Sequence, residues 1–252
     1  MEGQPGVALV TGSSRGLGRG IAERLAADGF AVAVNGSNAD HTADVAVAIR
    51  ARGGGTAEPF VADVTNAEQV DRLVSDVEAG LGPIQVLVLN ATGPQPEAPL
   101  MEVSWDDHLD QLRFFVLSPL LLGQAVIPGM RAAHYGRIVH VDSEVVHLPR
   151  PCRSAYVTAK SAQIGLMRAW ARELAPDGIT VNSVSPGFIP VERHADVSES
   201  AMDAYRASVP AGRMGTLEDV AAAVSYFASE AAGFVTGQRL IVDGGRALGW
   251  EP

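Results

Sequence analysis

Two residue types are almost missing from this chain of 252 residues: it has one cysteine, Cys152, and one lysine, Lys160. A single cysteine excludes an internal disulfide and a metal site built from cysteines. The scarcity of lysine is selective, because arginine supplies the other 18 of the 19 basic side chains. A position that keeps lysine in such a chain therefore calls for an explanation.

The chain also lacks an excess of positive charge and a long uninterrupted apolar run. Its formal net charge is -10, which argues against a nucleic-acid partner, since such partners select basic patches. The longest apolar run, 114–130, is broken by Ser118, Pro119, Gly123 and Gln124, and predicts a buried helix rather than a membrane span. The first residues have neither the charged nor the apolar part of a signal peptide. We expect a cytoplasmic protein without membrane association.

Short β-branched runs alternate with longer helical patterns along the whole chain. The runs that predict strands are 7–11, 31–35, 57–64, 86–90, 137–142, 179–185 and 239–243. The first six are nearly continuous apolar runs, typical of strands buried on both faces. The alternation predicts α/β architecture, with a doubly wound seven-stranded parallel sheet and helices on both faces.

Helical periodicity marks the segments between these strands. Amphipathic patterns at 17–29 and 67–80, and a long segment at 154–175, predict helices. Glycines stand where helix C-termini are expected, at Gly29, Gly80 and Gly178. No linker or change of composition divides the chain. We expect a single domain over 1–252, with a cofactor half at about 1–135 and a catalytic half at about 136–252.

The turn after the first strand reads TGSSRGLG (residues 11–18) and leads into the first helix. Its glycines permit a tight turn and a close approach of the backbone, so amide groups at the helix N-terminus can meet a pyrophosphate. The spacing is G-x-x-x-G-x-G rather than G-x-G-x-x-G. Glycine also serves ordinary turns, but the position between a strand and a helix favours dinucleotide binding.

The end of the second strand reads NGSN (residues 35–38), with no carboxylate before Asp40. A site that selects NAD usually places Asp or Glu here for the ribose 2′-hydroxyl. Arg15 in the glycine turn could instead face a 2′-phosphate. We expect NADP(H) as the preferred cofactor, with NAD(H) as the alternative and Arg15 then an ordinary solvated residue.

Tyr156 and Lys160 are four residues apart in a predicted helix, which places them on one face. A phenol has a pKa near about 10, and a neighbouring ammonium lowers it. Such a pair can act as a general acid on a carbonyl or a base on an alcohol. Ser143 follows the strand at 137–142, where its hydroxyl could hold a substrate oxygen. The plain alternative is a structural pair, which the single lysine and the phosphate turn disfavour.

The combination of T-G-x-x-x-G-x-G, the serine and Y-x-x-x-K resembles the short-chain dehydrogenase/reductase family over essentially the whole chain. The detail is most similar to its 3-oxoacyl-carrier-protein reductase and polyketide ketoreductase branch. Further matches are ADV (62–64), NSVSPG (182–187) and FVTGQRLIVDGG (234–245). The resemblance implies a Rossmann fold and an NADP(H)-dependent oxidoreductase acting on a CH–OH or C=O group, without a metal.

The resemblance also implies roles for individual residues. Tyr156 would be the acid or base, Ser143 would orient the carbonyl, and Lys160 would bind the nicotinamide ribose and lower the pKa of the tyrosine. The other implied cofactor contacts are Gly12, Ser14, Arg15, Gly16, Leu17 and Gly18 in the turn, Asn35 and Ser37 after the second strand, Asp63 and Val64 near adenine, Asn90 and Ala91 near ribose, and Pro186, Gly187 and Ile189 near the carboxamide.

The sequence departs from the family pattern at three places. The N-N-A-G after the fourth strand is replaced by LNAT (89–92), and Pro190 stands where a threonine is common. The catalytic asparagine expected near 112–115 is missing, because those residues are LRFF. That asparagine helps the family hold a water between lysine and solvent. Gln111, Ser118 or backbone alone are the candidates to replace it.

The segments 144–153 and 190–210 are expected to shape the substrate pocket. We expect a mainly apolar ketone, either a small molecule or a β-ketoacyl chain on a carrier protein, with Arg150 and Arg153 as candidates to attract its acidic groups. The resemblance implies a homotetramer, or a homodimer. The alternative functions are an NAD(P)-dependent alcohol or sugar dehydrogenase and a catalytically silent nucleotide-binding protein of the same family.

Overall fold

The computed structural model describes residues 6–53 and 55–248. Its centre is a parallel seven-stranded sheet with the order β3-β2-β1-β4-β5-β6-β7. The strands are β1 Val7–Val10, β2 Ala31–Gly36, β3 Ala57–Val61, β4 Ile84–Leu89, β5 Gly136–Val141, β6 Ile179–Pro186 and β7 Arg239–Val242. The predicted doubly wound parallel sheet is therefore confirmed, and each predicted strand is present with neither end displaced by more than three residues.

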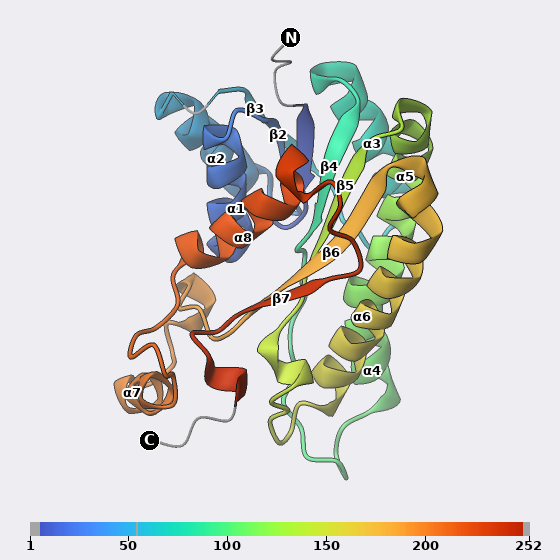
Figure 1. Cartoon of the computed structure of the whole chain (residues 1–252). Helices are drawn as coiled ribbons and strands as arrows, with labels where there is room; N and C mark the ends of the chain where they lie inside the picture. The colour runs from blue at the N-terminus through green and yellow to red at the C-terminus, as the bar shows by residue number, and fades with distance from the viewer. Residues whose placement is uncertain (1–5, 54, 249–252) are drawn as a thin grey trace.

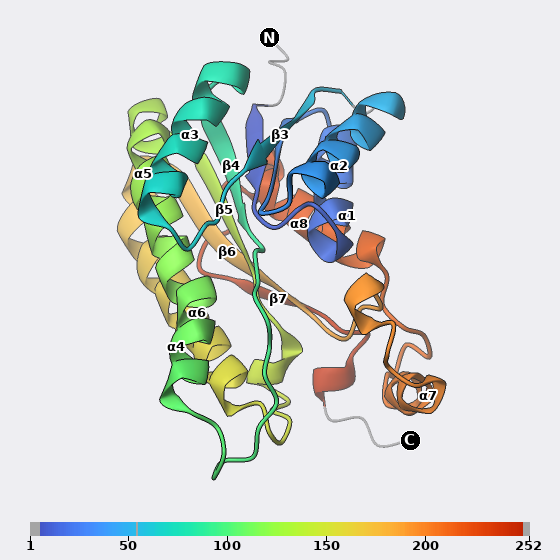
Figure 2. The ribbon, with the colours of Figure 1, turned by 180° about the vertical axis from the view of Figure 1, so that it is seen from behind.

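Helices cover both faces of the sheet. They are α1 Gly16–Ala27, α2 Ala39–Ala51, α3 Ala67–Leu81, α4 Trp105–Leu112, α5 Ser118–Ala133, α6 Ser154–Leu174, α7 Glu199–Ala207 and α8 Leu217–Ala228. Figures 1 and 2 show α1, α2 and α8 on one face and α3, α5 and α6 on the other. Helix α7 stands apart from both layers, below the edge where the strands end (Figure 1).

Each face of the sheet has its own apolar layer. Ile21, Leu25 and Phe227 belong to the layer under α1 and α8, and Leu122 and Met167 belong to the layer under α5 and α6. Each fully buried side chain of this size contributes about 1.5–3 kcal/mol through the hydrophobic effect. The two layers hold the strand ends in fixed positions, which is what a site at that edge needs.

The helix over 67–80 was predicted to end at Gly80, and this prediction is wrong. Gly80 lies inside α3, which continues to Leu81. Gly82 is the residue after the helix, and its backbone is left-handed with a φ of 103°. Because glycine adopts this conformation without steric cost, the helix ends at the glycine that needs it. Gly29 and Gly178 do follow their helices with positive φ, as predicted.

The apolar run at 114–130 lies within one continuous helical segment made of α4, a π-helical turn at Arg113–Leu117 and α5. Within the described part of the chain, the segment Trp105–Ala133 is the one helix whose length and composition would suit a membrane span. Its inner side places Phe115, Leu122 and Met130 in the core, so packing on the sheet explains part of its apolar character. Its outer side leaves Leu117 and Leu120 exposed.

The strand order reverses between β1 and β4, because β1 continues to β2 on one side and β4 to β5 on the other. Ligands of doubly wound sheets bind in the crevice at the carboxyl ends of strands at such a switch point. The ends of β1, β4, β5 and β6 all face this edge, since the strands are parallel. The glycine turn, Ser143 and the segment after Pro186 are therefore brought to one side of the molecule.

Candidate active site

The turn between β1 and α1 needs glycine for two separate reasons. Gly12 and Gly16 have left-handed backbones, with φ of 62° and 53°. A Cβ on Gly12 would lie 2.8 Å from the Cα of Ala91, and one on Gly18 would lie 2.3 Å from the Gly12 carbonyl oxygen. The turn, α1 and the end of β4 thus approach one another more closely than any side chain permits.

The N-terminus of α1, like those of α5 and α6, has no side-chain cap and no acidic residue in its first turn. Arg15 is the N-cap residue of α1. Helices α2, α3, α4, α7 and α8 all have a side-chain cap and an acid in the first turn. The open N–H groups and the positive end of the helix dipole suit an anion. The turn therefore fits the pyrophosphate of a dinucleotide, with the exposed Arg15 beside it.

Two of the expected cofactor residues have side chains that form hydrogen bonds with the backbone of the protein itself. Asn35 is buried, and its side chain accepts from Gly12 N at 3.4 Å and donates to Phe60 O at 3.2 Å. Asn90 donates through Nδ2 to the carbonyls of Thr11 and Gly12, at 3.0 and 3.1 Å. Both side chains therefore stabilise the turn.

The remaining expected cofactor contacts differ in how far their side chains are exposed. Ser14 and Leu17 are half-buried in the turn. Ser37 and Asp63 are exposed, whereas the side chain of Val64 is in the core, so that only its backbone can face a ligand. The residues Pro186, Gly187 and Ile189 follow β6, with Gly187 N donating to Val242 O at 3.0 Å and Ile189 buried in the core.

The structure brings Ser143 and Tyr156 together. Ser143 begins a short 3-10 turn after β5, and its hydroxyl accepts from Val145 N at 3.4 Å. Tyr156 lies in α6 and is 8% exposed. Burial raises the pKa of its phenol, and hydrogen bonding to the Ser143 side chain opposes that rise. Among positive charges, Arg193 and then Arg153 lower it most. The phenol is thus kept protonated, as a proton donor requires.

Lys160 is also buried, at 4% exposure. Its ammonium donates to Val141 O at 2.7 Å and to Gln163 Oε1 at 3.1 Å, and lies 5.9 Å from the centre of the Tyr156 ring. Burial lowers its pKa to about 7, against the attraction of the Asp142 carboxylate. The sequence led us to expect that Lys160 would lower the pKa of Tyr156. In the structure the pKa of Tyr156 is raised, because the effect of burial is the largest one, and the ammonium of Lys160 donates its hydrogen bonds to Val141 and Gln163.

The place of the missing asparagine is taken by an aromatic side chain. Phe115, in the π-helical turn, is 5.5 Å from the Tyr156 ring in an edge contact and 3.8 Å from Lys160 Nζ. Gln111 does not replace the asparagine: its Nε2 donates to Pro94 O at 2.7 Å, and it lines a cavity of about 500 Å³ beside that loop. Ser118 is buried where α5 begins. Gln163 holds the lysine instead, and the i, i+3 spacing could have revealed it.

Known proteins resemble this chain over nearly its whole length. Residues 12–247 match the protein family described as Enoyl-(Acyl carrier protein) reductase. The chain belongs to the short-chain dehydrogenase/reductase family. This dehydrogenase/reductase is accordingly an oxidoreductase acting on CH–OH or C=O groups.

Curated relatives of this dehydrogenase/reductase share about a third of its residues. It is 35% identical over 248 residues to the 3-oxoacyl-(acyl-carrier-protein) reductase FabG of Haemophilus influenzae, covering 98% of this chain and 100% of the relative. It is 38% identical over 244 residues to FabG of Staphylococcus epidermidis, covering 94% of this chain and 97% of the relative.

Solved structures show the same fold. A gluconate 5-dehydrogenase from Burkholderia cenocepacia, in complex with NADP and tartrate, superposes with a TM-score of 0.89 at 33% identity, covering 97% of this chain and 96% of that one. YwfH, an NADPH-dependent reductase involved in bacilysin biosynthesis, gives 0.90 at 25% identity, covering 95% and 97%.

In this dehydrogenase/reductase, acidic residues flank Ser143 on both sides, and each meets an arginine from the C-terminal part of the chain. Asp142 pairs with Arg239 of β7, whose Nη2 also donates to Ser143 O and Ser185 Oγ, both at 2.7 Å. Sequence reasoning missed this pair. Both side chains are almost completely buried, and burial raises the pKa of Asp142 although Lys160 and Arg239 oppose it.

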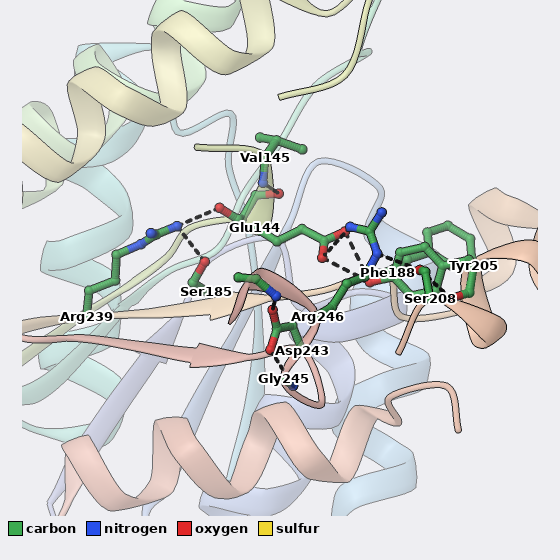
Figure 3. Close-up of polar contacts among 12 residues, drawn as sticks. Glu144, Val145, Ser185, Phe188, Tyr205, Ser208, Arg239, Asp243, Gly245 and Arg246 are labelled. Carbon is green, nitrogen blue, oxygen red and sulfur yellow. Dashed lines mark hydrogen bonds and ion pairs between the residues drawn. The ribbon is translucent and has the colours of Figure 1, made fainter. Parts of the chain in front are cut away.

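The second acid, Glu144, joins three segments. Its carboxylate accepts from the Tyr205 hydroxyl at 3.0 Å and pairs with Arg246 Nη1 at 3.1 Å, and the same hydroxyl accepts from Phe188 N at 2.6 Å (Figure 3). Burial raises the pKa of Glu144, and Arg246 opposes this. Helix α7 and the C-terminal turn are thereby fastened to the residue next to Ser143.

Proposed function

We propose that the chain is an NADP(H)-dependent ketone reductase in which Tyr156 is the general acid. The observation that carries the proposal is the buried phenol, which burial keeps protonated while the Ser143 side chain lies within hydrogen-bonding reach. A neutral phenol can give its proton to an oxygen that gains negative charge, and the cations Arg193 and Arg153, which lower the pKa of this phenol against the effect of burial, favour that transfer.

When bound, the nicotinamide supplies a hydride to the carbonyl carbon. The Ser143 hydroxyl donates a hydrogen bond to the carbonyl oxygen and holds it toward α6. The Tyr156 hydroxyl passes its proton to that oxygen as the C=O double bond becomes a C–OH single bond. Lys160, whose Nζ lies 5.9 Å from the centre of the Tyr156 ring, would act on the tyrosinate so formed through its charge when it is protonated, and not through a hydrogen bond seen in this structure.

The preference for NADP(H) over NAD(H) rests on the charge around the end of β2. Ser37 and Asn38 are exposed there, and the first carboxylate, Asp40, already lies in the first turn of α2. Arg15 is exposed across the turn, where a 2′-phosphate would find a cation. The gluconate 5-dehydrogenase that superposes on this chain was solved with NADP.

We infer that the substrate is a β-ketoacyl thioester, on a carrier protein or as a small molecule, because the FabG relatives are named for that reaction. Arg153 is engaged by Glu97 and Gln95, while Arg193 is exposed and acts electrostatically on Tyr156. Arg193 is therefore the better candidate to attract an acidic group of the substrate. We place the enzyme in the cytoplasm as a homotetramer or homodimer, in which the exposed Leu117 and Leu120 would be covered.

A second candidate is the interconversion of a sugar acid and its keto form. The same cationic surroundings of Tyr156, from Arg193 and Arg153, would attract the carboxylate of such a substrate. The gluconate 5-dehydrogenase with bound NADP and tartrate supports this candidate. Tyr156 would then serve as acid in one direction and as base in the other.

The test is cofactor oxidation against a defined set of substrates. Acetoacetyl pantetheine thioester, its carrier-protein form, 5-ketogluconate, a simple cyclic ketone and crotonyl thioester are each offered with NADPH and with NADH. We expect consumption of NADPH with the acetoacetyl thioesters. Turnover of 5-ketogluconate alone would establish the second candidate, and turnover of crotonyl thioester alone would make the enzyme a reducer of C=C bonds.

Tyr156→Phe tests the role of the hydroxyl, because it removes one oxygen and keeps the ring against Phe115. We expect a loss of about 10²–10⁴-fold in kcat, the usual contribution of a general acid, with binding of NADPH retained in a fluorescence titration. Unchanged turnover in Tyr156→Phe, or tight NADPH binding without reduction of any substrate, would refute the proposed function.

A further inference from the structure

We propose that Gln163 is the positioning residue for the Lys160 ammonium, in place of the asparagine that residues 112–115 lack. The inference rests on the proposed function, in which Lys160 supports Tyr156. It goes beyond that function because it gives a role to a residue that neither touches the substrate nor belongs to the Y-x-x-x-K pattern. A positioning residue acts through another group, so its effect must be visible at Lys160 itself.

Three protein groups surround the ammonium, and a lysine has three hydrogens to donate. Val141 O accepts at 2.7 Å and Gln163 Oε1 at 3.1 Å, and the ring of Phe115 lies 3.8 Å away, within cation–π range. Gln163 and Phe115 are each 2% exposed. The lysine is therefore held by protein groups, and one of them, Phe115, belongs to residues 112–115, where the family pattern has asparagine.

Within the described residues, none of the charged or titratable groups around Lys160 does what Gln163 does, which is to accept a hydrogen bond from the ammonium through its side chain. From β5, Asp142 attracts the ammonium but is itself paired with Arg239. His140, also from β5, is fully buried, and burial lowers its pKa to about 3, so it stays neutral. The exposed Arg193, after β6, repels the ammonium.

Within α6 the neighbouring titratable group is Tyr156, which burial keeps neutral. In the described part of the chain, Gln163 is thus the side chain that accepts a hydrogen bond from the ammonium.

Removing or charging this acceptor must change the proton affinity of Lys160 in opposite directions. Gln163→Leu deletes one of two acceptors in a buried place, so the ammonium is less stable and its pKa falls. Gln163→Glu keeps an oxygen at the same reach and adds negative charge, so the pKa rises. A residue that only fills space would not produce shifts of opposite sign from two substitutions of similar volume.

The single lysine makes a direct measurement practicable. Protein grown with ¹³C-labelled lysine gives one Cε signal, that of Lys160, whose chemical shift follows its protonation. We expect the wild type to titrate near pH 7, Gln163→Leu about one unit lower and Gln163→Glu about one unit higher, the size expected for one hydrogen bond or charge at a buried ammonium. Gln111→Leu is the matched control, because it removes a buried glutamine that binds Pro94 instead, and should titrate as the wild type.

Either of two results would overturn the proposal: both Gln163 variants titrating with the wild type, or both shifting in the same direction. Circular dichroism and NADPH binding establish that the variants are folded, and Gln163→Met, which also lacks the acceptor oxygen, replaces Gln163→Leu if that variant does not fold. The titration needs no turnover, so opposite shifts without any ketone reduction would refute the proposed function and keep the positioning role. Where both hold, the pH limb of kcat/KM that reports Lys160 moves with each variant.

Discussion

The glycine turn and the segment around Ser143 lie at the same edge of one sheet but are built in different ways. The turn consists of small residues and backbone, and its polar groups are paired: Asn35 and Asn90 each bind backbone across the turn. The catalytic side consists of buried charge, and some of its polar atoms have no partner within the described residues, namely both nitrogens of His140, Asp142 Oδ1 and Arg239 Nη1.

The difference follows from what each region must do. A phosphate site needs backbone amides that can come close to the ligand and are held in place. Gly12 and Gly18 permit this, because the backbone packs around them where no Cβ would fit. A proton-transfer site needs groups whose charge is finely balanced, which burial next to opposite charge provides. We therefore expect substitutions in the turn to be harmful when they introduce a steric clash. Substitutions on the catalytic side should be harmful when they leave a buried charge without its partner.

The largest effect is expected from Arg239→Met, which leaves Asp142 buried without its partner. Breaking one side of a buried pair costs about 3–5 kcal/mol, so the free energy of unfolding should fall by that amount in urea denaturation. Adding Asp142→Asn should recover much of the loss, since the uncompensated charge is gone. Arg206→Met is the control, because its pair with Asp203 is exposed. A similar loss in that control would show that the effect is not one of burial.

A smaller effect is expected from Gly18→Ala, which tests the steric side of the comparison. Its Cβ would lie 2.3 Å from Gly12 O and 2.4 Å from Asn90 Nδ2, so the turn must shift, at about 1–3 kcal/mol. NADPH binding measured by calorimetry should weaken with it. Gly165→Ala is the matched control in α6, since nothing lies within 4 Å of its Cβ and helix propensity favours alanine. Unchanged NADPH affinity in Gly18→Ala would contradict this account of the turn.

The smallest effect is expected from Glu144→Gln and depends on pH. Burial raises the pKa of Glu144 above 4.5, the ordinary value for a glutamate, so the folded protein holds this proton to higher pH than the unfolded chain does. The free energy of unfolding of the wild type therefore falls as the pH rises from about 4.5, the pKa of a free glutamate, through the higher pKa of the folded state. The variant lacks this loss, so its thermal midpoint relative to the wild type should increase across that window. A constant difference between the two proteins would mean that Arg246 compensates the charge fully.

The sequence allows the strands and the glycine turn to be predicted because both depend on local patterns. Ser143, Tyr156 and Lys160 could be found too, since strand end and helical spacing place them. The partner of Asp142 could not, because Arg239 is 97 residues away and only the register of β5, β6 and β7 brings it there. The pKa of Tyr156 was misjudged for a similar reason, since its burial depends on Phe115 in a π-helical turn that periodicity does not indicate.

The rarity of lysine has a consequence for the exterior of the enzyme. Because Lys160 is 4% exposed, the described surface presents its positive charge through guanidinium groups, which stay protonated and are poor nucleophiles at neutral pH. Reactive acyl donors, including thioesters of the kind proposed as substrate, would find almost no free amine on that surface to acylate. An enzyme that handles such compounds at high concentration would thus be protected from slow chemical modification by its own composition.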